Sequence, residues 1–336
     1  MNDNKLRPAA IGLRPFILRP AAKDYLWGGQ RLNTEFGKGI DLDPLAETWE
    51  CSTHPDGPSI AATGEFAGQS LDKILREHPE MAGTHPDMSD GLPVLIKLID
   101  AREDLSVQVH PNDEYAREHE NGQRGKTELW YVLDAREDAR LVYGLSQAVG
   151  RDRLLDALRQ GTVGKYLRKV PVRRDDVFFV EAGTIHALGA GCLIAEIQES
   201  SNITYRLYDY DRAGKDGKKR PLHIQKALDV ARLEGSDEPR QPMRVLKYRP
   251  GAAVELLCRC GWFEVSRLIV NTREDTPVTF AADSLSFRVL LCTDGEGTAE
   301  FAGDTLEIKK GQCMFVPASS VEIHLRGRMT FLDVRC

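Results

Sequence analysis

The chain has 336 residues, which is enough for one large domain or two ordinary domains with a substantial core. Hydrophobic residues make up 41% and charged residues 29%, the balance of a soluble globular protein rather than a disordered one. The formal net charge is −6 and Lys and Arg are scattered, which argues against a nucleic-acid partner, because such binding depends on clustered basic groups. No apolar run approaches the roughly 20 residues that span a bilayer.

The N-terminus and the cysteines indicate the compartment. Residues 1–5 lead into no apolar segment of signal-peptide length, so we expect a cytoplasmic protein. The seven cysteines agree, because their number is odd and no Cys-x-x-Cys pair occurs. Cys258 and Cys260 would share one face of a strand, and we expect both to be buried as small hydrophobic residues rather than to bind a metal.

Helical patterns are few and strand patterns dominate. A helix is predicted at residues 71–75, where Ser70 is a good N-cap residue, and two more at residues 152–158 and 224–231, each with an apolar stripe. Short β-prone segments bounded by turns predict strands. They are residues 92–99, 105–109, 129–133, 177–180, 192–197, 263–270, 286–292 and 329–334.

Many short strands separated by turns predict a mainly β protein built as a double-sheet roll or barrel. Residues 178–186 and 314–324 are alike, since each is typical of a buried strand, a turn and a second strand, which indicates a duplicated barrel. The charged, Pro-containing segment 234–242 is predicted to be a linker. It divides a first region, residues 1–240, from a smaller second domain, residues 241–336.

Polar residues alternate with apolar ones around residues 105–110. On a strand, Ser106, Gln108 and His110 would share one face, with the apolar residues behind them. This pattern suits a strand that lines a polar barrel interior, although a strand with one solvated face has the same pattern.

A second segment, residues 126–130, repeats the arrangement with Lys126, Glu128 and Trp130 on one face. Together with His186, which follows a predicted buried strand, these segments offer two imidazoles, a carboxylate and an amide oxygen. Such a donor set suits a catalytic zinc with open positions for water or substrate. The amide of Gln108 ranks last among the four, because Gln is an uncommon zinc ligand, and a lone histidine beside a strand is more often hydrogen-bonded or exposed.

Residues 196–212 are dense in polar and aromatic groups. For most of them a solvated edge or loop is the simpler interpretation. Arg206, between Tyr205 and Leu207, is the exception that we single out. A guanidinium held near a metal can pair with phosphate or with negative charge that develops on a substrate oxygen.

Seven short motifs occur in order along the first region. They are Trp27-Gly28-Gly29, Glu47-Thr48-Trp49-Glu50, Lys97-Leu98-Ile99-Asp100, Leu105–Asp113, Gly125-Lys126-Thr127-Glu128, Gly183-Thr184-Ile185-His186-Ala187 and Ser200–Arg212. Each motif alone is weak evidence for a family. Their joint order and spacing resemble those of the class I mannose-6-phosphate isomerases, particularly the short bacterial form. The resemblance implies a cupin (jelly-roll) barrel core with inserted helices and a smaller C-terminal cupin-like β domain.

The resemblance also implies an aldose–ketose isomerase that interconverts mannose 6-phosphate and fructose 6-phosphate through an enediol or enediolate, with one Zn²⁺ per chain. By the family pattern, zinc is held by Gln108, His110, Glu128 and His186. Arg206 matches the family's catalytic arginine and Glu196 an acidic residue of the same pocket. Lys97, Ser106 and Lys126 match residues placed around the substrate. The catalytic base stays open among a hydroxide at the zinc, Glu196 and a lysine such as Lys126.

The chain departs from the family pattern at two places. Longer members carry His where this chain has Gly125 and Asp where it has Asn202, which puts in doubt any proton shuttle through these positions. The C-terminal segment matches poorly, and we expect no second metal at His324. Two rival functions remain: an isomerase of an unphosphorylated or different sugar, and a non-catalytic two-cupin sugar-binding protein. The second disagrees with the presence of all four ligand positions and Arg206.

Overall fold

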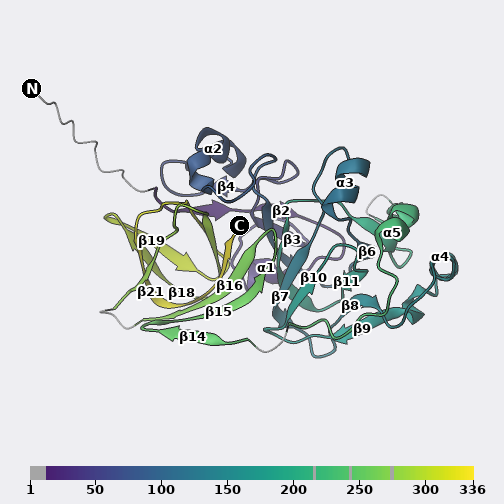
Figure 1. Ribbon diagram of the computed structural model, residues 1–336. Helices are drawn as coiled ribbons and strands as arrows, with labels where there is room; N and C mark the ends of the chain where they lie inside the picture. Colours follow the sequence, from purple (N-terminus) through teal and green to yellow (C-terminus); the bar gives the residue numbers. More distant parts are fainter. Residues whose placement is uncertain (1–12, 215–216, 242–243, 273–275) are drawn as a thin grey trace, which may run out of the picture. The chain divides into compact units, whose positions relative to one another are not determined.

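The computed structural model describes residues 13–214, 217–241, 244–272 and 276–336. Residues 1–5 and Pro242 of the predicted linker lie outside these ranges. The chain forms two compact units, both built from separate segments (Figure 1). Among the described residues, unit 1 combines residues 13–19 with Ser59–Pro93 and Arg244–Cys336, and unit 2 combines Pro20–Pro58 with residues 94–241.

Unit 1 contains one antiparallel sheet of ten strands. The strands are β1 (Phe16–Arg19), β4 (Ile60–Ala61), β14 (Leu246–Arg249), β15 (Ala252–Arg259), β16 (Glu264–Asn271), β17 (Val278–Phe280), β18 (Arg288–Phe301), β19 (Asp304–Lys309), β20 (Cys313–Val316) and β21 (Ile323–Arg335). Helix α2 (Leu71–Glu77) and the short 3₁₀ helix η1 (Pro79–Ala82) complete the unit. The long strands β18 and β21 curve strongly, as a sheet that rolls up on itself requires (Figure 1).

The core of unit 1 lies inside this rolled sheet. Alternate residues of its strands point inward, and Leu290, Phe331 and Ile323 are fully buried there. Residues 59–93 belong to this unit rather than to the first region where the sequence analysis placed them, because β4 pairs with β1 and β1 pairs with β20.

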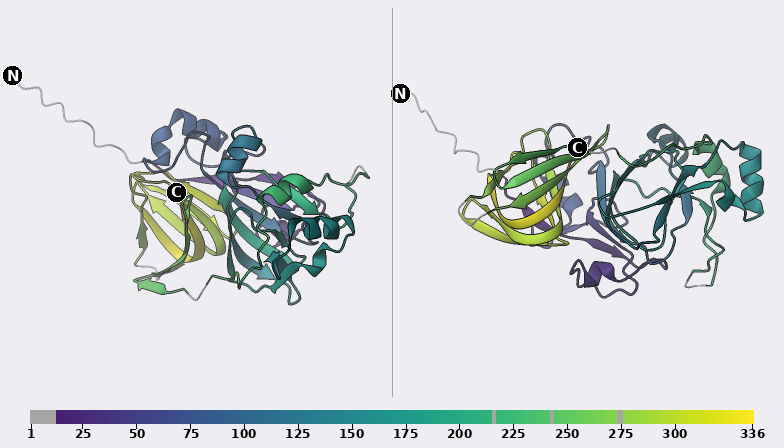
Figure 2. Two further views of the ribbon diagram at one scale, coloured as in Figure 1. Left: turned by 45° about the vertical axis from the view of Figure 1, so that its right-hand side comes forward. Right: turned by 90° about the horizontal axis from the view of Figure 1, so that it is seen from below.

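Unit 2 contains two antiparallel sheets. The six-stranded sheet has the order β10 (Val177–Val180), β7 (Glu128–Ala135), β12 (Cys192–Glu199), β5 (Val94–Asp100), β3 (Glu47–Cys51) and β2 (Ala21–Lys23). The five-stranded sheet has the order β13 (Tyr205–Tyr208), β6 (Val107–Val109), β11 (His186–Leu188), β8 (Arg140–Leu145) and β9 (Leu167–Pro171). The teal strands of both sheets bend around a common interior (Figure 2).

Helices cover the outer face of the five-stranded sheet. The helices of unit 2 are α1 (Arg31–Thr34), α3 (Asp113–His119), α4 (Arg151–Arg159), α5 (Ile224–Val230) and the 3₁₀ helix η2 (Val163–Lys165). Apolar residues of α3, α4 and α5 pack with Val107 and Val109 of β6 in one buried cluster. A second cluster, with Trp130, Phe178 and Leu105, fills one part of the space between the sheets. The rest of that space is polar and holds the candidate site.

Most of the predicted elements are present. The mainly β fold is confirmed, the strand predicted at 177–180 is β10, and the three predicted helices are α2, α4 and α5. The two alike segments both form a strand, a turn and a second strand, β10 to β11 in unit 2 and β20 to β21 in unit 1. The strand predicted at 105–109 is shorter in the structure, where β6 covers only Val107–Val109. Leu105 packs between the sheets, whereas Val107 and Val109 pack under the helices, so the regular alternation of faces begins only after Leu105.

Two further expectations differ from the structure. The described part of the predicted linker, residues 234–241, is bound to unit 2, where the amide of Ser236 donates to Leu145 O and that of Gln241 to Val177 O. Cys258 and Cys260 are half-buried rather than buried, because they lie beside the turn that ends β15, after a register shift in its pairing with β16. Among the described residues, no helix has the length and apolar character to cross a membrane.

Candidate active site

Three sequence-predicted residues lie in one row across the five-stranded sheet. Arg206 on β13 is paired with Gln108 on β6, and Gln108 is paired with His186 at the start of β11. Cross-strand partners share a face of a sheet, so all three side chains belong to the same side. Their neighbours Val107 and Val109 point to the opposite side and pack under the helices. The row therefore faces the interior between the two sheets.

The six-stranded sheet contributes a second row. Trp130 on β7, Glu196 on β12, Lys97 on β5 and Trp49 on β3 are consecutive cross-strand partners. Glu128 lies two residues before Trp130 on β7, so its side chain shares this face in the next row. Both rows carry polar side chains into the same interior, which is how residues from distant parts of the sequence meet.

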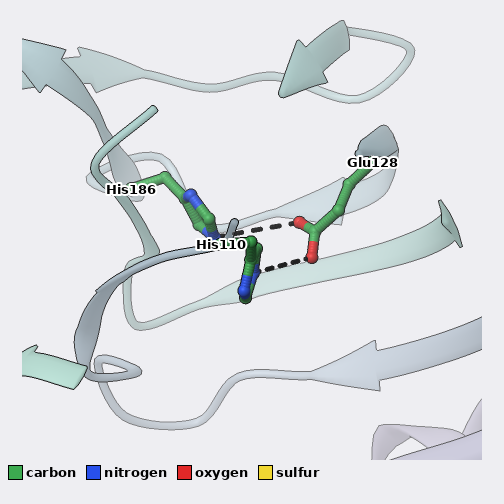
Figure 3. Close-up of side chains that lie close together, drawn as sticks. All are labelled: His110, Glu128 and His186. Atoms are coloured by element: carbon green, nitrogen blue, oxygen red, sulfur yellow. Dashed lines mark ion pairs between the residues drawn. The ribbon is translucent and has the colours of Figure 1, made fainter. Parts of the chain in front are cut away.

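His110, Glu128 and His186 converge at the centre of this interior (Figure 3). Nε2 of His110 lies 3.0 Å from Oε1 of Glu128, and Nε2 of His186 lies 3.8 Å from Oε2 of the same carboxylate. The ligand atoms of the three residues all lie within 4.8 Å of one another, and all three side chains are buried. We call these residues the triad.

Hydrogen bonds to the protein backbone orient both imidazole rings. Nδ1 of His110 lies 2.8 Å from the carbonyl oxygen of Ile203, and Nδ1 of His186 lies 2.8 Å from that of Thr184. A carbonyl can only accept, so each Nδ1 carries the proton and each Nε2 presents a lone pair to the interior. Burial, with Lys126 nearby, lowers the pKa of His110 to about 3, and burial also lowers the pKa of His186. Both rings are therefore neutral at pH 7, the form that binds metals.

The triad fits a divalent metal ion. The carboxylate of Glu128 is fully buried, and among the described residues neither of its oxygens receives a well-aligned hydrogen bond. Burial raises the pKa of Glu128, but the charge of Lys126, together with the adjacent imidazoles of His110 and His186, outweighs this, so the net pKa is well below the usual value. The ionised, buried carboxylate and the two imidazole lone pairs are donors that a divalent metal ion binds, and the ammonium of Lys126 lies 2.5 Å from Oε1 of the same carboxylate.

Gln108 completes the set of expected ligands. Its Nε2 lies 3.4 Å from Nε2 of His186. A half-turn of the amide about its Cγ–Cδ bond exchanges the nitrogen and oxygen positions, so the amide oxygen can face the triad. The structure thus brings the four residues together. The two histidines and Gln108 come from the side of the five-stranded sheet, and Glu128 comes from the six-stranded sheet.

Two lysines and a second carboxylate lie beside the triad. Nζ of Lys126 is 2.5 Å from Oε1 of Glu128, and Nζ of Lys97 is 3.3 Å from Oε1 of Glu196. Burial raises the pKa of Glu196, and the charge of Glu128 adds to the shift. Burial acts to lower the pKa of Lys97, but the carboxylates of Glu47, Glu196 and Glu128 outweigh it, so the net shift is upward. Lys97 is consequently a cation at neutral pH.

A cleft of about 280 Å³ opens next to the triad. Six sequence-predicted residues line it: Lys97, Ser106, Gln108, Lys126, Glu196 and Arg206. Within it, Nε of Arg206 donates to Oγ of Ser106 at 3.3 Å and Nη1 donates to the carbonyl of Pro221 at 3.0 Å. Burial, followed by the charge of Arg220, lowers the pKa of Arg206. This guanidinium is positioned by the protein and still faces the cleft.

Arg220 and Tyr25 also line the cleft and were missed by the sequence analysis. Asp209 holds Arg220 in the cleft wall through two hydrogen bonds, from Nε at 2.7 Å and Nη2 at 2.6 Å. The only signal in the sequence was the basic run Lys218–Arg220, which resembles many exposed loops. Only the folded position of Asp209 distinguishes Arg220 from its two neighbours.

The two departures from the family pattern have different surroundings. Gly125 lies against backbone, since a Cβ at this position would come within 2.5 Å of Asn112 C and Asp113 N. The position therefore accepts no side chain in this structure. Asn202 lines the cleft, and its Nδ2 donates to Oδ2 of Asp56 at 2.8 Å. An amide there offers a hydrogen bond and no titrating proton.

Comparisons with known proteins give matches along most of the chain. The family model described as "Phosphomannose isomerase type I, catalytic domain" matches residues 16–138, and that described as "Mannose-6-phosphate isomerase, cupin domain" matches residues 259–335. Two relatives from Bacillus subtilis (strain 168) are similar over nearly their whole length. "Probable mannose-6-phosphate isomerase GmuF" is 36% identical over 95% of this chain and 98% of its own. "Mannose-6-phosphate isomerase ManA" is 34% identical over 93% and 96%.

Solved structures extend the comparison to three dimensions. The crystal structure of the mannose 6-phosphate isomerase from Bacillus subtilis aligns with a TM-score of 0.89 at 34% identity. The alignment covers 96% of this chain and 100% of that one. A putative mannosephosphate isomerase from Archaeoglobus fulgidus aligns with a TM-score of 0.76 at 19% identity, over 97% of this chain and 98% of that one. The second match is a likeness of fold alone.

Proposed function

Because this chain belongs to the type I phosphomannose isomerase family, we propose that it interconverts mannose 6-phosphate and fructose 6-phosphate. The observation that carries the proposal is the triad of His110, Glu128 and His186, which lies next to a cleft lined by Arg206 and Glu196. Metal ligands, a guanidinium and a second carboxylate are the groups that such an isomerisation needs.

We propose zinc as the metal, one ion per chain. The triad offers two neutral imidazole nitrogens and one carboxylate, a set that suits zinc better than magnesium or calcium, which prefer oxygen ligands alone. Gln108 would add an amide oxygen and the cleft would leave room for the substrate. Bound zinc acts as a Lewis acid on substrate oxygens and lowers the pKa of a bound water.

The residues of the chain would carry the proton transfer. Aldose-to-ketose conversion removes the proton from C2 and returns one to C1, while the O2 proton moves to O1. Oε1 of Glu196 faces the cleft between Lys97 at 3.3 Å and Lys126 at 3.9 Å, so it is placed to take and return the carbon-bound proton. Arg206 would stabilise the negative charge of the enediolate, and Ser106, which accepts its hydrogen bond, would keep the guanidinium in place.

Arg220 would bind the phosphate. Its guanidinium group lines the cleft together with that of Arg206, and Asp209 holds Arg220 in a fixed orientation. Planar guanidinium groups recognise phosphate oxygens through paired hydrogen bonds.

The small phosphosugar is the partner that we propose, and the cytoplasm is the proposed compartment. All seven cysteines are free thiols, and free thiols persist in reducing compartments.

A coupled assay of fructose 6-phosphate formation from mannose 6-phosphate tests the proposal. The protein is stripped of metal with a chelator and divided into portions that receive zinc, magnesium or no metal. We expect turnover to return with zinc and to stay absent without metal. Mannose without phosphate is the matched control substrate. If the folded, zinc-loaded protein is inactive on mannose 6-phosphate but active on mannose, the unphosphorylated sugar replaces mannose 6-phosphate as the assigned substrate.

A further inference from the structure

We propose that Trp130 and Trp49 are positioning residues, whose indole N–H groups hold Glu196 and Glu47 on either side of Lys97. The inference rests on the proposed function of Glu196 in proton transfer. It assigns a role to two side chains that the sequence alone would place in the core. The four residues Trp130, Glu196, Lys97 and Trp49 stand in one row across strands β7, β12, β5 and β3.

Trp130 fixes one oxygen of the Glu196 carboxylate. Its Nε1 donates to Oε2 of Glu196 at 3.0 Å, and both side chains are buried. The contact follows from the pairing of the strands, since the two residues are direct cross-strand partners. With Oε2 engaged, only Oε1 remains to face Lys97 and Lys126. The hydrogen bond thus selects which oxygen of Glu196 meets the substrate.

Trp49 repeats this arrangement on the other side of Lys97. Its Nε1 donates to Oε2 of Glu47 at 2.8 Å, and that oxygen lies 3.9 Å from Nζ of Lys97. The ammonium of Lys97 also lies 5.1 Å from the centre of the Trp49 ring, within the range of a cation–π contact. Lys97 is therefore held from two sides and cannot turn toward the triad without leaving both carboxylates.

Space filling alone does not explain these tryptophans. A buried indole N–H needs an acceptor, and a phenyl or leucyl side chain would fill a core without that requirement. Phe178 shows the difference, because it is the cross-strand neighbour of Trp130 in the same row, is fully buried and has no polar atom in its side chain. Both tryptophans use the N–H on a carboxylate that flanks Lys97. Trp130 also lies edge-on to His186, with ring centres 5.3 Å apart, so it contacts both parts of the site.

Nuclear magnetic resonance of the indole groups tests the hydrogen bonds without turnover. In protein labelled with ¹⁵N-tryptophan, the Trp130 signal is assigned by its loss in Trp130→Phe. We expect this proton signal to be shifted downfield in the wild type and to move upfield in Glu196→Gln, where the acceptor loses its charge. The Trp49 signal should respond in the same way to Glu47→Gln. If the Trp130 signal stays in place in Glu196→Gln and the Trp49 signal stays in place in Glu47→Gln, the proposal is overturned.

Kinetics then test whether the contact serves the reaction. We expect Trp130→Phe to lower kcat about tenfold or more, with KM changed by less than about threefold and bound metal unchanged. In a Glu196→Gln background the same change should cost less than about twofold, because the positioned group is already altered. Phe178→Leu is the matched control; it should lower stability and keep kcat within about twofold. A Trp130→Phe enzyme with normal kcat, or equal losses in both backgrounds, would contradict the inference.

The two readouts separate the inference from the proposed function. If the wild type has no activity on mannose 6-phosphate, the proposed function fails, and the resonance shifts still decide whether each tryptophan holds its carboxylate. If the wild type is active and the shifts do not occur, the positioning role fails by itself.

Discussion

Nε2 of His110 lies 3.0 Å from Oε1 of Glu128, although the strands that carry or precede these residues, β6 and β7, belong to different sheets. The contact joins the two sheets at the polar part of their shared interior. A charged carboxylate and two neutral imidazoles meet there, with the ammonium of Lys126 2.5 Å from Oε1 of Glu128 and 3.4 Å from Nε2 of His110. Such a site is organised for a ligand with positive charge, and metal binding there can be separated from catalysis by mutation.

Removing a triad residue should cost metal and activity together, whereas removing Arg206 should cost activity alone. We expect His186→Ala to lose bound zinc and turnover, because its Nε2 is one of the two imidazole donors. Arg206→Ala should retain zinc and lower kcat about 100-fold, because a charge contact to the enediolate is lost. Metal analysis of the purified variants, beside their kcat, measures both effects. An Arg206→Ala protein without zinc, or with near-normal turnover, would refute the assignment.

Arg220→Ala should weaken substrate binding more than it slows the reaction. We expect KM for mannose 6-phosphate to rise at least about tenfold, because the charged hydrogen-bond partner that we propose for the phosphate is removed from the cleft wall. Steady-state kinetics should show a much smaller change in kcat. Arg232→Ala is the control, since Arg232 is exposed and pairs with Glu181 outside the cleft. Equal changes in KM for the two variants would place the phosphate elsewhere.

Glu199 should make stability depend on pH. Burial raises its pKa from the ordinary 4.5 to about 8, and the nearby charge of Asp113 adds to the shift. Between these values the folded state holds a proton that the unfolded state has released. The protonated carboxyl of Glu199 therefore contributes its full stabilisation of the folded state below pH 4.5. The free energy of unfolding falls as the pH rises from 4.5 through 8, by at most about 5 kcal/mol in total.

Chemical denaturation at several pH values between 5 and 8 measures this dependence. Glu199→Gln keeps the shape and removes the titrating proton, so its unfolding free energy should decline less over the range than that of the wild type. If the two proteins show the same slope, Glu199 does not hold the proton.

Gly125 should tolerate no side chain. A Cβ would come within 2.5 Å of the backbone of Asn112 and Asp113, so Gly125→Ala must displace the segment that leads to Lys126. We expect the unfolding free energy to fall by about 1–3 kcal/mol. Gly164→Ala is the matched control, because nothing lies within 4 Å of its added Cβ, and it should change stability by less than about 0.5 kcal/mol. Thermal or chemical unfolding decides between the two expectations.

Local patterns in the sequence determined much of the secondary structure. A short β-prone run bounded by turns marked the strand at 177–180, and an apolar stripe marked the helix at 152–158. Alternation with period two placed Gln108 and Glu128 on faces opposite their apolar neighbours. These signals work because the side-chain direction in a strand or helix depends on residues close in the chain. Local patterns ranked Gln108 last among four candidate ligands and singled out Arg206 as a cation, and the family resemblance then implied their specific roles.

The tertiary structure alone decided which of these faces meet. Glu128 reaches His110 only because the two sheets curve around one interior, and Arg220 enters the cleft only because Asp209 holds it there. The membership of β4 in unit 1 depends on its pairing with β1, and the N–H of Trp130 reaches Glu196 through strand register. Pairing between segments far apart in the chain is chosen by the packing of the whole fold, and no window of sequence contains that information.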